Sequence, residues 1–449
     1  MLIFQIFLYI CNNSLSAAEY FILRMTYYIT YIKPAIRFFL VFLFLFFVLN
    51  GIFSAEKNTG DSIFIKSDTL KYTGIARELV KGMTKADFEA LDTIQWLAVQ
   101  PADTSWHKPK VSLLRQHTYS DLTAIIDSLA KSSMVKVLKA STTSVDGRPI
   151  YCLEIGIGSR TIVFDAGIHA REVGNPQFLL KFASELVDSY QKNDSFYMQL
   201  LQKNKLVILP CINPDGYEAA ILGKNAIRNK NLFLANQTDE KIFTAKCNAN
   251  GVDLNRNFPS YSASLVWANE KTDNRRTDTI PSVNYYTGPS LGSEPETKVI
   301  MNFLMKYIPV AEKYIDFHSA GRLIYAGKPH LSDEFNEATL KTGRLIESIT
   351  GYSLLGTKQE DTGRGTDGTI TDFAAEIAAG YIYNEKLGRI APASSDSVIK
   401  KTSTFPYKCT VNTVETIKTS RKEGYGLLRA SSPAMHTKEW ELFRLKELF

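Results

Sequence analysis

The stretch TIVFDAGIHARE at residues 161–172 joins an apolar run, typical of a buried β-strand, to two side chains that can bind a metal ion. His169 and Glu172 stand three residues apart, and imidazole and carboxylate are both zinc ligands. A second apolar run, YIDFHSAG at 314–321, also leads into a histidine, His318. Two histidines and one carboxylate leave one zinc position open for water, which is the catalytic and not the structural arrangement.

The context of these histidines is more informative than the HxxE pattern, because short patterns of common residues recur by chance. The chain contains 6 histidines, and His169 and His318 are the two that follow strong apolar runs. In open α/β sheets, ligands bind beyond the carboxyl ends of the strands. The sequence therefore predicts a metal centre at such an edge of a sheet.

Apolar runs and helical patterns alternate along most of the chain. Strand-like runs lie at 149–157, 161–168 and 205–212, and helical patterns lie at 176–191 and 294–308. This alternation predicts an α/β fold: a single large domain with a mixed, largely parallel central sheet flanked by helices on both faces.

The alternation begins at about residue 112, so we expect the catalytic domain to span residues 112–449. Its first helix is expected over 120–133, with Ser120 as the N-cap. Residues 56–111 are expected to form a propeptide-like or spacer segment, with one or two amphipathic helices over 74–99.

The N-terminal region has the composition of a targeting segment. Lys33 and Arg37 precede the run FFLVFLFLFFVLNGIFSA at 38–55, after which the chain turns polar. A basic region, an apolar core and small residues at the exit are typical of a secretory signal peptide, here cleaved near Ala55. The alternative is a retained membrane segment. We therefore expect residues 1–55 to be a signal peptide or an N-terminal membrane segment, and the protein to be secreted, extracellular or periplasmic, or else anchored by this segment.

The overall composition argues against a nucleic-acid partner. Hydrophobic residues make up 45% of the chain and the formal net charge is +6, without a run rich in lysine and arginine. The chain has 5 cysteines, of which Cys11 lies in the targeting region. The other four could pair in three ways or remain buried free thiols; they are Cys152, Cys211, Cys247 and Cys409.

A second cluster of polar residues lies in GVDLNRNF at 251–258. Asn255 and Arg256 provide an amide and a planar guanidinium, which together suit the binding of a carboxylate. Asp253 could orient a metal-bound imidazole by accepting its second N–H. The alternative interpretation is a loop with incidental ion pairs.

Four short motifs in this order resemble those of the zinc metallocarboxypeptidases of the carboxypeptidase A type. The motifs are HARE at 169–172, NPDG at 213–216, DLNRNF at 253–258 and DFHS at 316–319, and the resemblance covers roughly residues 112–449. It implies one zinc ion held by His169, Glu172 and His318, and a peptide substrate whose free C-terminal carboxylate contacts Asn255 and Arg256. It further implies a more distant substrate contact at Arg171 and an oxyanion-stabilising residue at Arg228, with Lys230 as its rival.

The resemblance also implies a glutamate as general base, for which the chain offers two candidates. Glu415 lies in the β-branched run KCTVNTVET at 408–416, and Glu385 lies in YIYNEKL at 381–387. We choose Glu415, which implies an insertion at 376–410. The tyrosine that caps the bound C-terminus in this family has no counterpart in QEDTGRG at 359–365. The residues expected at the floor of the side-chain pocket, TITD at 369–372, are neither large and apolar nor simply acidic.

These features predict a secreted zinc-dependent enzyme that removes C-terminal residues from peptides and proteins, with a membrane contact only if the N-terminal segment is retained. A hydrolase of bacterial cell-wall peptides, of the γ-glutamyl-diaminopimelate type, is the alternative within the same class. An alternative of another class is a catalytically inactive carboxylate-binding protein with the same fold.

Overall fold

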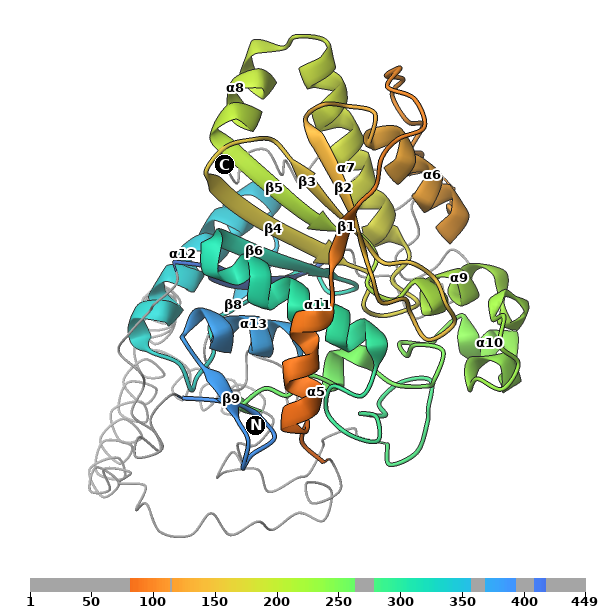
Figure 1. Ribbon diagram of the computed structural model, residues 1–449. Helices are drawn as coiled ribbons and strands as arrows, with labels where there is room; N and C mark the ends of the chain where they lie inside the picture. The colour runs from red at the N-terminus through yellow and green to blue at the C-terminus, as the bar shows by residue number, and fades with distance from the viewer. Residues whose placement is uncertain (1–80, 114, 263–277, 357–367, 393–407, 417–449) are drawn as a thin grey trace, which may run out of the picture. The chain divides into compact units, whose positions relative to one another are not determined.

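The fold is built around a nine-stranded sheet, shown in Figure 1. The computed structural model describes residues 81–113, 115–262, 278–356, 368–392 and 408–416. The strand order is β1-β2-β3-β5-β4-β6-β11-β7-β8. The strands are β1 (Trp96–Ala98), β2 (Val135–Ala140), β3 (Tyr151–Ile155), β4 (Arg160–Ala166), β5 (Asn204–Leu209), β6 (Ala311–His318), β7 (Leu323–Ala326), β8 (Ser353–Leu355) and β11 (Thr410–Glu415).

The sheet is mixed, and its centre is parallel. β4 pairs in parallel with β5 and β6, and β6 pairs in parallel with β11. The pairs β1–β2, β2–β3, β3–β5 and β11–β7 are antiparallel, and β8 runs parallel to β7 at the other edge. This arrangement confirms the predicted α/β fold with a largely parallel central sheet.

Helices cover both faces of the sheet because its central strands are apolar on both sides. Along β4, Ile162 and Phe164 belong to the hydrophobic core beneath α6 and α7, whereas Val163 belongs to the core beneath α11 and α13. The helices are α5 (Lys85–Glu89), α6 (Tyr119–Leu129), α7 (Gly174–Gln191), α8 (Ser195–Lys203), α9 (Pro214–Leu222), α10 (Asp239–Ile242), α11 (Pro295–Tyr307), α12 (Asp333–Thr350) and α13 (Ile370–Ala378).

Helix α6 begins earlier than the sequence predicted. Thr118, not Ser120, is its N-cap: the Thr118 side chain accepts from the Asp121 amide, and the Asp121 carboxylate accepts from the Thr118 amide. This reciprocal pair leaves fewer backbone donors unsatisfied than a cap at Ser120 would, and it therefore fixes the start of the helix.

Residues 81–98, which the sequence analysis assigned to a spacer, pack into the fold. The expected helices over 74–99 are partly wrong, because a short helix, α5, is followed by a 3₁₀ turn (Ala90–Thr93) and then by strand β1. The residues Ile94, Trp96 and Val99 favour strand over helix, and the edge of β2 offers backbone partners to Trp96 and Val99. Leu91 is fully buried in the core, and Trp96 donates a hydrogen bond from Nε1 to Asn302 Oδ1 of α11 at 2.8 Å.

Part of the predicted insertion at 376–410 is a hairpin that lies against these N-terminal residues. Its strands are β9 (Ile382–Asn384) and β10 (Arg389–Ala391), which pair antiparallel. The ring of Tyr383 stacks on Phe88 with centroids 4.3 Å apart, and its hydroxyl donates to the Met83 carbonyl at 2.7 Å. Gly82 is required there, because a Cβ on it would lie 2.7 Å from Gly388 Cα.

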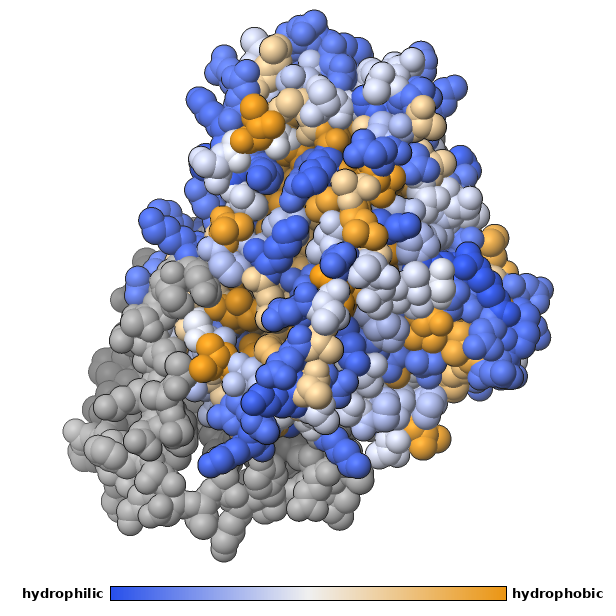
Figure 2. All heavy atoms as spheres, in the orientation of Figure 1, coloured by the Kyte–Doolittle hydropathy of each residue, from blue (hydrophilic) through white to orange (hydrophobic). Residues whose placement is uncertain are grey.

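Cys152, Cys211, Cys247 and Cys409 are buried free thiols, so no disulfide joins them. Within the described ranges, every helix is too short or too polar to cross a bilayer. The face drawn in Figure 2 is mostly hydrophilic, with hydrophobic side chains exposed in small separate groups. The predicted signal or membrane segment at 1–55 lies outside the described residues.

We expect Leu91→Ala to destabilise the protein by about 2–5 kcal/mol, because it removes a fully buried side chain from the core. The matched control Leu97→Ala, at a side chain that is 46% exposed, should cost less than about 0.5 kcal/mol. Urea denaturation of the full-length protein measures both free energies of unfolding. Equal effects of the two substitutions would mean that residues 81–98 are only loosely attached.

Candidate active site

The parallel pairing at the centre of the sheet brings four chemically active side chains to one edge. His169 and Glu172 follow the end of β4, His318 ends β6, and Glu415 ends β11. The register pairs Ala166 of β4 with Phe317 of β6, and His318 with Glu415 of β11. Residues almost 250 positions apart in the sequence therefore meet at the carboxyl ends of adjacent strands, as expected for ligand sites in α/β sheets.

The three predicted metal ligands converge on one point. The Nδ1 atoms of His169 and His318 are 3.2 Å apart, and Glu172 places Oε1 2.7 Å from the first and Oε2 3.1 Å from the second. All three side chains are buried, and one ligand atom from each lies within 4.8 Å of the others. Two imidazole nitrogens and a carboxylate form a donor set that suits zinc.

Carboxylates stand behind both imidazoles and favour one tautomer. Asp253 Oδ1 lies 3.3 Å from His169 Nε2, and Asp316 Oδ2 lies 3.0 Å from His318 Nε2. A proton on Nε2 faces these carboxylates and leaves the Nδ1 lone pair free for a metal ion. The residues therefore fit a zinc ion both in donor type and in orientation.

The electrostatics of the cluster also favour a bound cation. Burial alone would raise the pKa of Glu172, but the charges and hydrogen bonds of His169 and His318 lower it overall. Burial would likewise raise the pKa of Asp253, and the charge of His169 lowers it. Both carboxylates are thus anionic. The backbone amide of Ser319 donates to Glu172 Oε2 at 3.1 Å and fixes its orientation.

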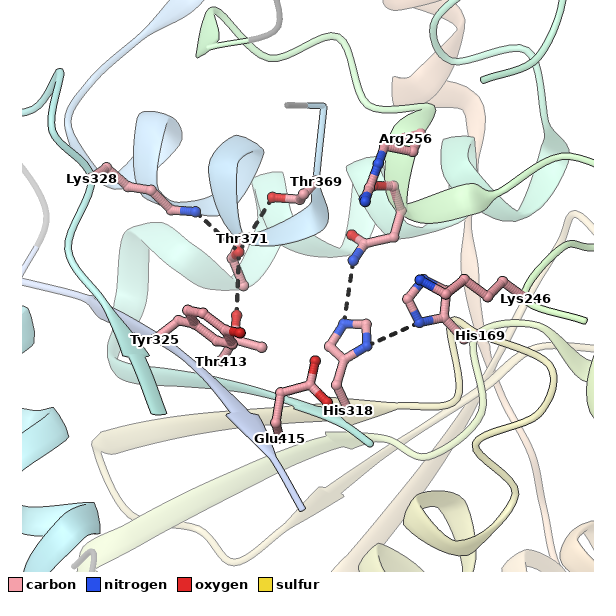
Figure 3. A pocket seen from close by; sticks show the side chains of 11 residues that line it. His169, Lys246, Arg256, His318, Tyr325, Lys328, Thr369, Thr371, Thr413 and Glu415 are labelled. Carbon is pink, nitrogen blue, oxygen red and sulfur yellow. Dashed lines mark hydrogen bonds between the residues drawn. The ribbon is translucent and has the colours of Figure 1, made fainter. Parts of the chain in front are cut away.

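A cavity of about 140 Å³ opens over this cluster, and Figure 3 shows the side chains around it. Its lining combines the two histidines of the predicted metal site with cationic side chains, hydroxyl groups and the carboxylate of Glu415. The lining residues are His169, Lys246, Asn255, Arg256, His318, Tyr325, Lys328, Thr369, Thr371, Thr413 and Glu415.

Of the two glutamates considered as general base, only Glu415 lines the cavity. The residue is half-buried, but its Oε2 atom is buried and has no hydrogen-bond partner among the described residues. Burial raises its pKa, and the charge of His318 partly offsets that effect. Glu385 is different: its side chain is 69% exposed and lies 3.8 Å from the ammonium of Lys85, within the hairpin that contacts α5.

Asn255 and Arg256 reach the cavity from a 3₁₀ turn, Leu254–Arg256. Asp253 Oδ1 caps this turn by accepting from the Asn255 amide at 3.0 Å. The Asn255 side chain accepts from the Ile370 amide at 2.9 Å, which ties the turn to the start of α13. Arg256 donates from Nη1 to the Asn255 carbonyl at 2.7 Å, and none of the described carboxylates forms an ion pair with it. Its guanidinium can therefore bind a carboxylate of a ligand.

Two other residues that were expected at the site lie outside the cavity. Arg171 donates from Nη1 to the Thr244 carbonyl at 3.1 Å. The backbone amide of Arg228 donates to Asp146, and its Nη1 is 3.4 Å from the Gly147 carbonyl. Lys230, the rival of Arg228, donates to the Ile227 carbonyl at 2.5 Å.

Two lysines that sequence reasoning missed line the cavity instead. Lys246 lies beside His169 in Figure 3, and its carbonyl accepts from the Ala170 amide at 3.1 Å, so its loop is tied to the ligand loop. Lys328 follows β7 and donates to Asp372 Oδ1 at 2.5 Å and to Thr371 Oγ1 at 3.3 Å. Each is a single lysine in a loop, without a local pattern that could have marked it.

Comparisons with known proteins agree with this geometry. A family model described as zinc carboxypeptidase matches residues 122–417. Mast cell carboxypeptidase A of Mus musculus is 33% identical over 199 residues, which are 42% of this chain and 41% of that protein. Carboxypeptidase A6 of Mus musculus is 27% identical over 305 residues, 64% of each chain. The matched part thus spans less than two thirds of the length of these relatives.

A solved structure has the same fold at low sequence identity. Bovine thrombin-activatable fibrinolysis inhibitor, in complex with tick carboxypeptidase inhibitor, is 23% identical and has a TM-score of 0.50. The match covers 75% of this chain and 97% of that one.

Measurements of metal affinity can test whether Asp253 orients the imidazole of His169. We expect Asp253→Asn to weaken zinc binding by about 10- to 100-fold, because an amide oxygen orients the imidazole less strongly than a carboxylate does. The exposed Asp92→Asn should bind zinc as the unmodified protein does. Competition with a chromophoric chelator measures both affinities, and equal affinities would exclude a role of Asp253 in holding the ligand.

Proposed function

Because the chain belongs to the zinc carboxypeptidase family, we propose that it hydrolyses the last peptide bond of peptides and proteins that have a free C-terminus. One observation carries the proposal: the His169, Glu172 and His318 cluster shares a cavity with the guanidinium of Arg256. A cation that recognises a terminal carboxylate, held at a fixed distance from a hydrolytic centre, restricts cleavage to the end of a chain.

In this proposal His169, Glu172 and His318 would hold one zinc ion. When bound, zinc supplies a Lewis acid that polarises the scissile carbonyl and makes water a nucleophile at neutral pH. The chain's own contribution to this step is Glu415, whose buried and unpartnered Oε2 accepts the proton of the attacking water. The same carboxyl group then donates this proton to the leaving amine.

Asn255 and Arg256 hold the terminal carboxylate of the substrate. The guanidinium supplies two parallel N–H donors, and the amide of Asn255 adds a neutral one. The hydrogen bond that the Ile370 amide donates to the Asn255 side chain keeps this pair in position before the substrate arrives. Such preorganisation lowers the entropic cost of placing the scissile bond at the reactive centre.

Lys246 is the best-placed cation for the negative oxygen that develops on the scissile carbonyl. Its side chain lines the cavity beside His169, and none of the carboxylates in the described part of the chain forms an ion pair with it. Its loop makes two backbone bonds to the ligand loop, from the Ala170 amide to the Lys246 carbonyl and from the Arg171 amide to the Ala245 carbonyl. We therefore assign to Lys246 the role that the sequence analysis gave to Arg228.

Secretion is part of the proposal and rests on the basic and apolar pattern of residues 1–55. N-terminal sequencing of protein recovered from the medium tests it directly: a start near Glu56 supports cleavage, whereas recovery of the uncleaved chain from membranes supports an anchor.

Peptides of one sequence with free and amidated C-termini test the activity. We expect the zinc-loaded protein to remove single residues from the free peptides only, and a chelator to abolish this activity. Glu415→Gln should lower kcat/KM by about 10²–10⁴-fold, because the water loses its proton acceptor. Glu385→Gln is the matched control and should retain full activity, since that side chain lies on the surface.

Cleavage within peptides, or equal cleavage of amidated ones, would contradict a role for Arg256 in selecting chain ends. Hydrolysis of cell-wall peptides alone, with none of the ordinary peptides cleaved, would favour the alternative substrate class. Zinc binding without any turnover would favour the inactive carboxylate-binding protein.

Lys246→Met should lower kcat by about 10²–10³-fold with a smaller change in KM, as expected when a donor to a developing oxyanion is lost. Lys246→Arg should restore part of the activity because it keeps the charge. Arg228→Met is the rival variant and should lose less than about tenfold. Steady-state kinetics on one good peptide decide between the two residues, and a larger loss in Arg228→Met would return the role to Arg228.

A further inference from the structure

The cavity has a second polar end that the proposed mechanism does not use. In Figure 3, Lys328 and three threonines lie on the side away from His169 and Lys246. The threonine hydroxyls form a chain, with Thr371 Oγ1 3.3 Å from both Thr369 Oγ1 and Thr413 Oγ1. This end is built from three separate parts of the fold: the residues after β7, the start of α13 and strand β11.

Lys328 is held firmly and retains one free donor. An ammonium group has three N–H donors, and Asp372 and Thr371 accept two of them, at 2.5 Å and 3.3 Å. The Lys328 side chain is only 20% exposed and lines the cavity, so its third donor is available to a bound ligand.

The partner of Lys328 is itself fixed. Asp372 Oδ2 accepts from the Thr369 amide at 3.2 Å, and the Thr369 hydroxyl accepts from the Asp372 amide at 3.0 Å, which forms the capping box of α13. Burial alone would raise the pKa of Asp372, but the charge of Lys328 lowers it overall. Asp372 therefore orients Lys328 from behind as an anion, while it is not itself among the residues that line the cavity.

The charges around the cavity disfavour a basic ligand side chain at this end. Among the lining residues of the described chain, Lys246, Arg256 and Lys328 are cationic, and Glu415 beside His318 is the one carboxylate. A lysine or arginine side chain placed beside Lys328 would meet a like charge with no carboxylate free to receive it.

An apolar side chain is disfavoured for a different reason. The lining at this end offers an ammonium and three hydroxyls, with Tyr325 as its aromatic member. An aliphatic or aromatic side chain placed here would remove water from the third N–H of Lys328 without giving it a partner, and a buried donor left unpaired is unfavourable. A site built from hydrogen-bonding groups rejects ligands that lack the matching group.

We propose that Lys328 selects substrates whose C-terminal residue carries a negatively charged side chain. The proposal rests on the proposed carboxypeptidase function, in which Asn255 and Arg256 hold the terminal carboxylate. The side-chain carboxylate accepts the third N–H of Lys328 and is solvated further by the hydroxyl chain through Thr371. The side chain of a C-terminal glutamate or aspartate would accept a charge-assisted hydrogen bond from Lys328. The amide oxygen of a glutamine would accept a weaker bond, because it carries no net charge.

The test uses N-blocked tripeptides that differ only in the last residue: Glu, Gln, Leu, Phe or Lys. We expect the zinc-loaded, full-length protein to have a kcat/KM for Glu at least tenfold above those for Leu, Phe and Lys, with Gln in between. Lys328→Met should lower kcat/KM for Glu by about 10- to 100-fold, mainly through KM, and leave the value for Leu unchanged or raised. Lys328→Arg should keep the preference for Glu.

A matched control is Lys341→Met, at an exposed lysine of α12, which should change none of these values. A preference of the unmodified protein for Leu, Phe or Lys would overturn the proposal. A loss in Lys328→Met that is equal for all five peptides would also overturn it, because that result indicates a structural role of the Lys328–Asp372 pair.

Binding separates this proposal from the proposed function. Calorimetry of the same peptides with the Glu415→Gln variant measures affinity without turnover. If no peptide is hydrolysed by the unmodified protein but Glu-terminated peptides still bind most tightly and lose this advantage in Glu415→Gln/Lys328→Met, the proposed function fails and the selection by Lys328 stands. Equal binding of all five peptides to Glu415→Gln overturns the selection, whatever the activity.

Discussion

The parallel register of β6 with its neighbours is the constraint on which the site depends. It aligns His318 with Glu415 on one side and brings the end of β4, which leads into His169 and Glu172, alongside on the other. A slip of one residue would move these side chains by about 3.3 Å and turn alternate residues to the opposite face. Ligand atoms about 3 Å apart tolerate no such slip. The apolar cores on both faces, which hold the sheet in register, therefore also determine the geometry of the metal centre.

The parts of the site that could be predicted from the sequence are those that follow a strand directly. His169, Glu172, His318 and Glu415 each lie at or just after a run of apolar or β-branched residues, so one local pattern gave both the strand and the position of the functional side chain. Asn255 and Arg256 were identifiable for another reason, since an amide beside a guanidinium suits a carboxylate. The α/β fold followed from the alternation of the same runs with helical patterns, and the family assignment agrees with the order of the motifs.

The parts that could not be predicted depend on contacts between distant loops. Lys246 and Lys328 reach the cavity because a backbone bond to Ala170 and a pair with Asp372 place their loops there, and neither contact leaves a periodic signal. Arg228 was chosen as the one arginine of KNAIRNKN at 224–231, between the NPDG and DLNRNF motifs, and this position does not determine where an irregular segment directs its side chains. Strand β1 was missed because three residues with a partner strand look, in sequence, like the end of a helix.

The contacts of residues 81–98 with the β9–β10 hairpin join two segments that are synthesised far apart in time. Met83 donates from its amide to the Gly388 carbonyl at 2.7 Å and accepts from the Tyr383 hydroxyl, across a separation of 300 residues. Segments made early on the ribosome thus have to wait for partners that emerge near the end of translation, and contacts of such long range form late and slowly. Until then Met83 and Phe88 lack the partners that they have in the folded protein, so this end of the chain is among the last to complete its packing.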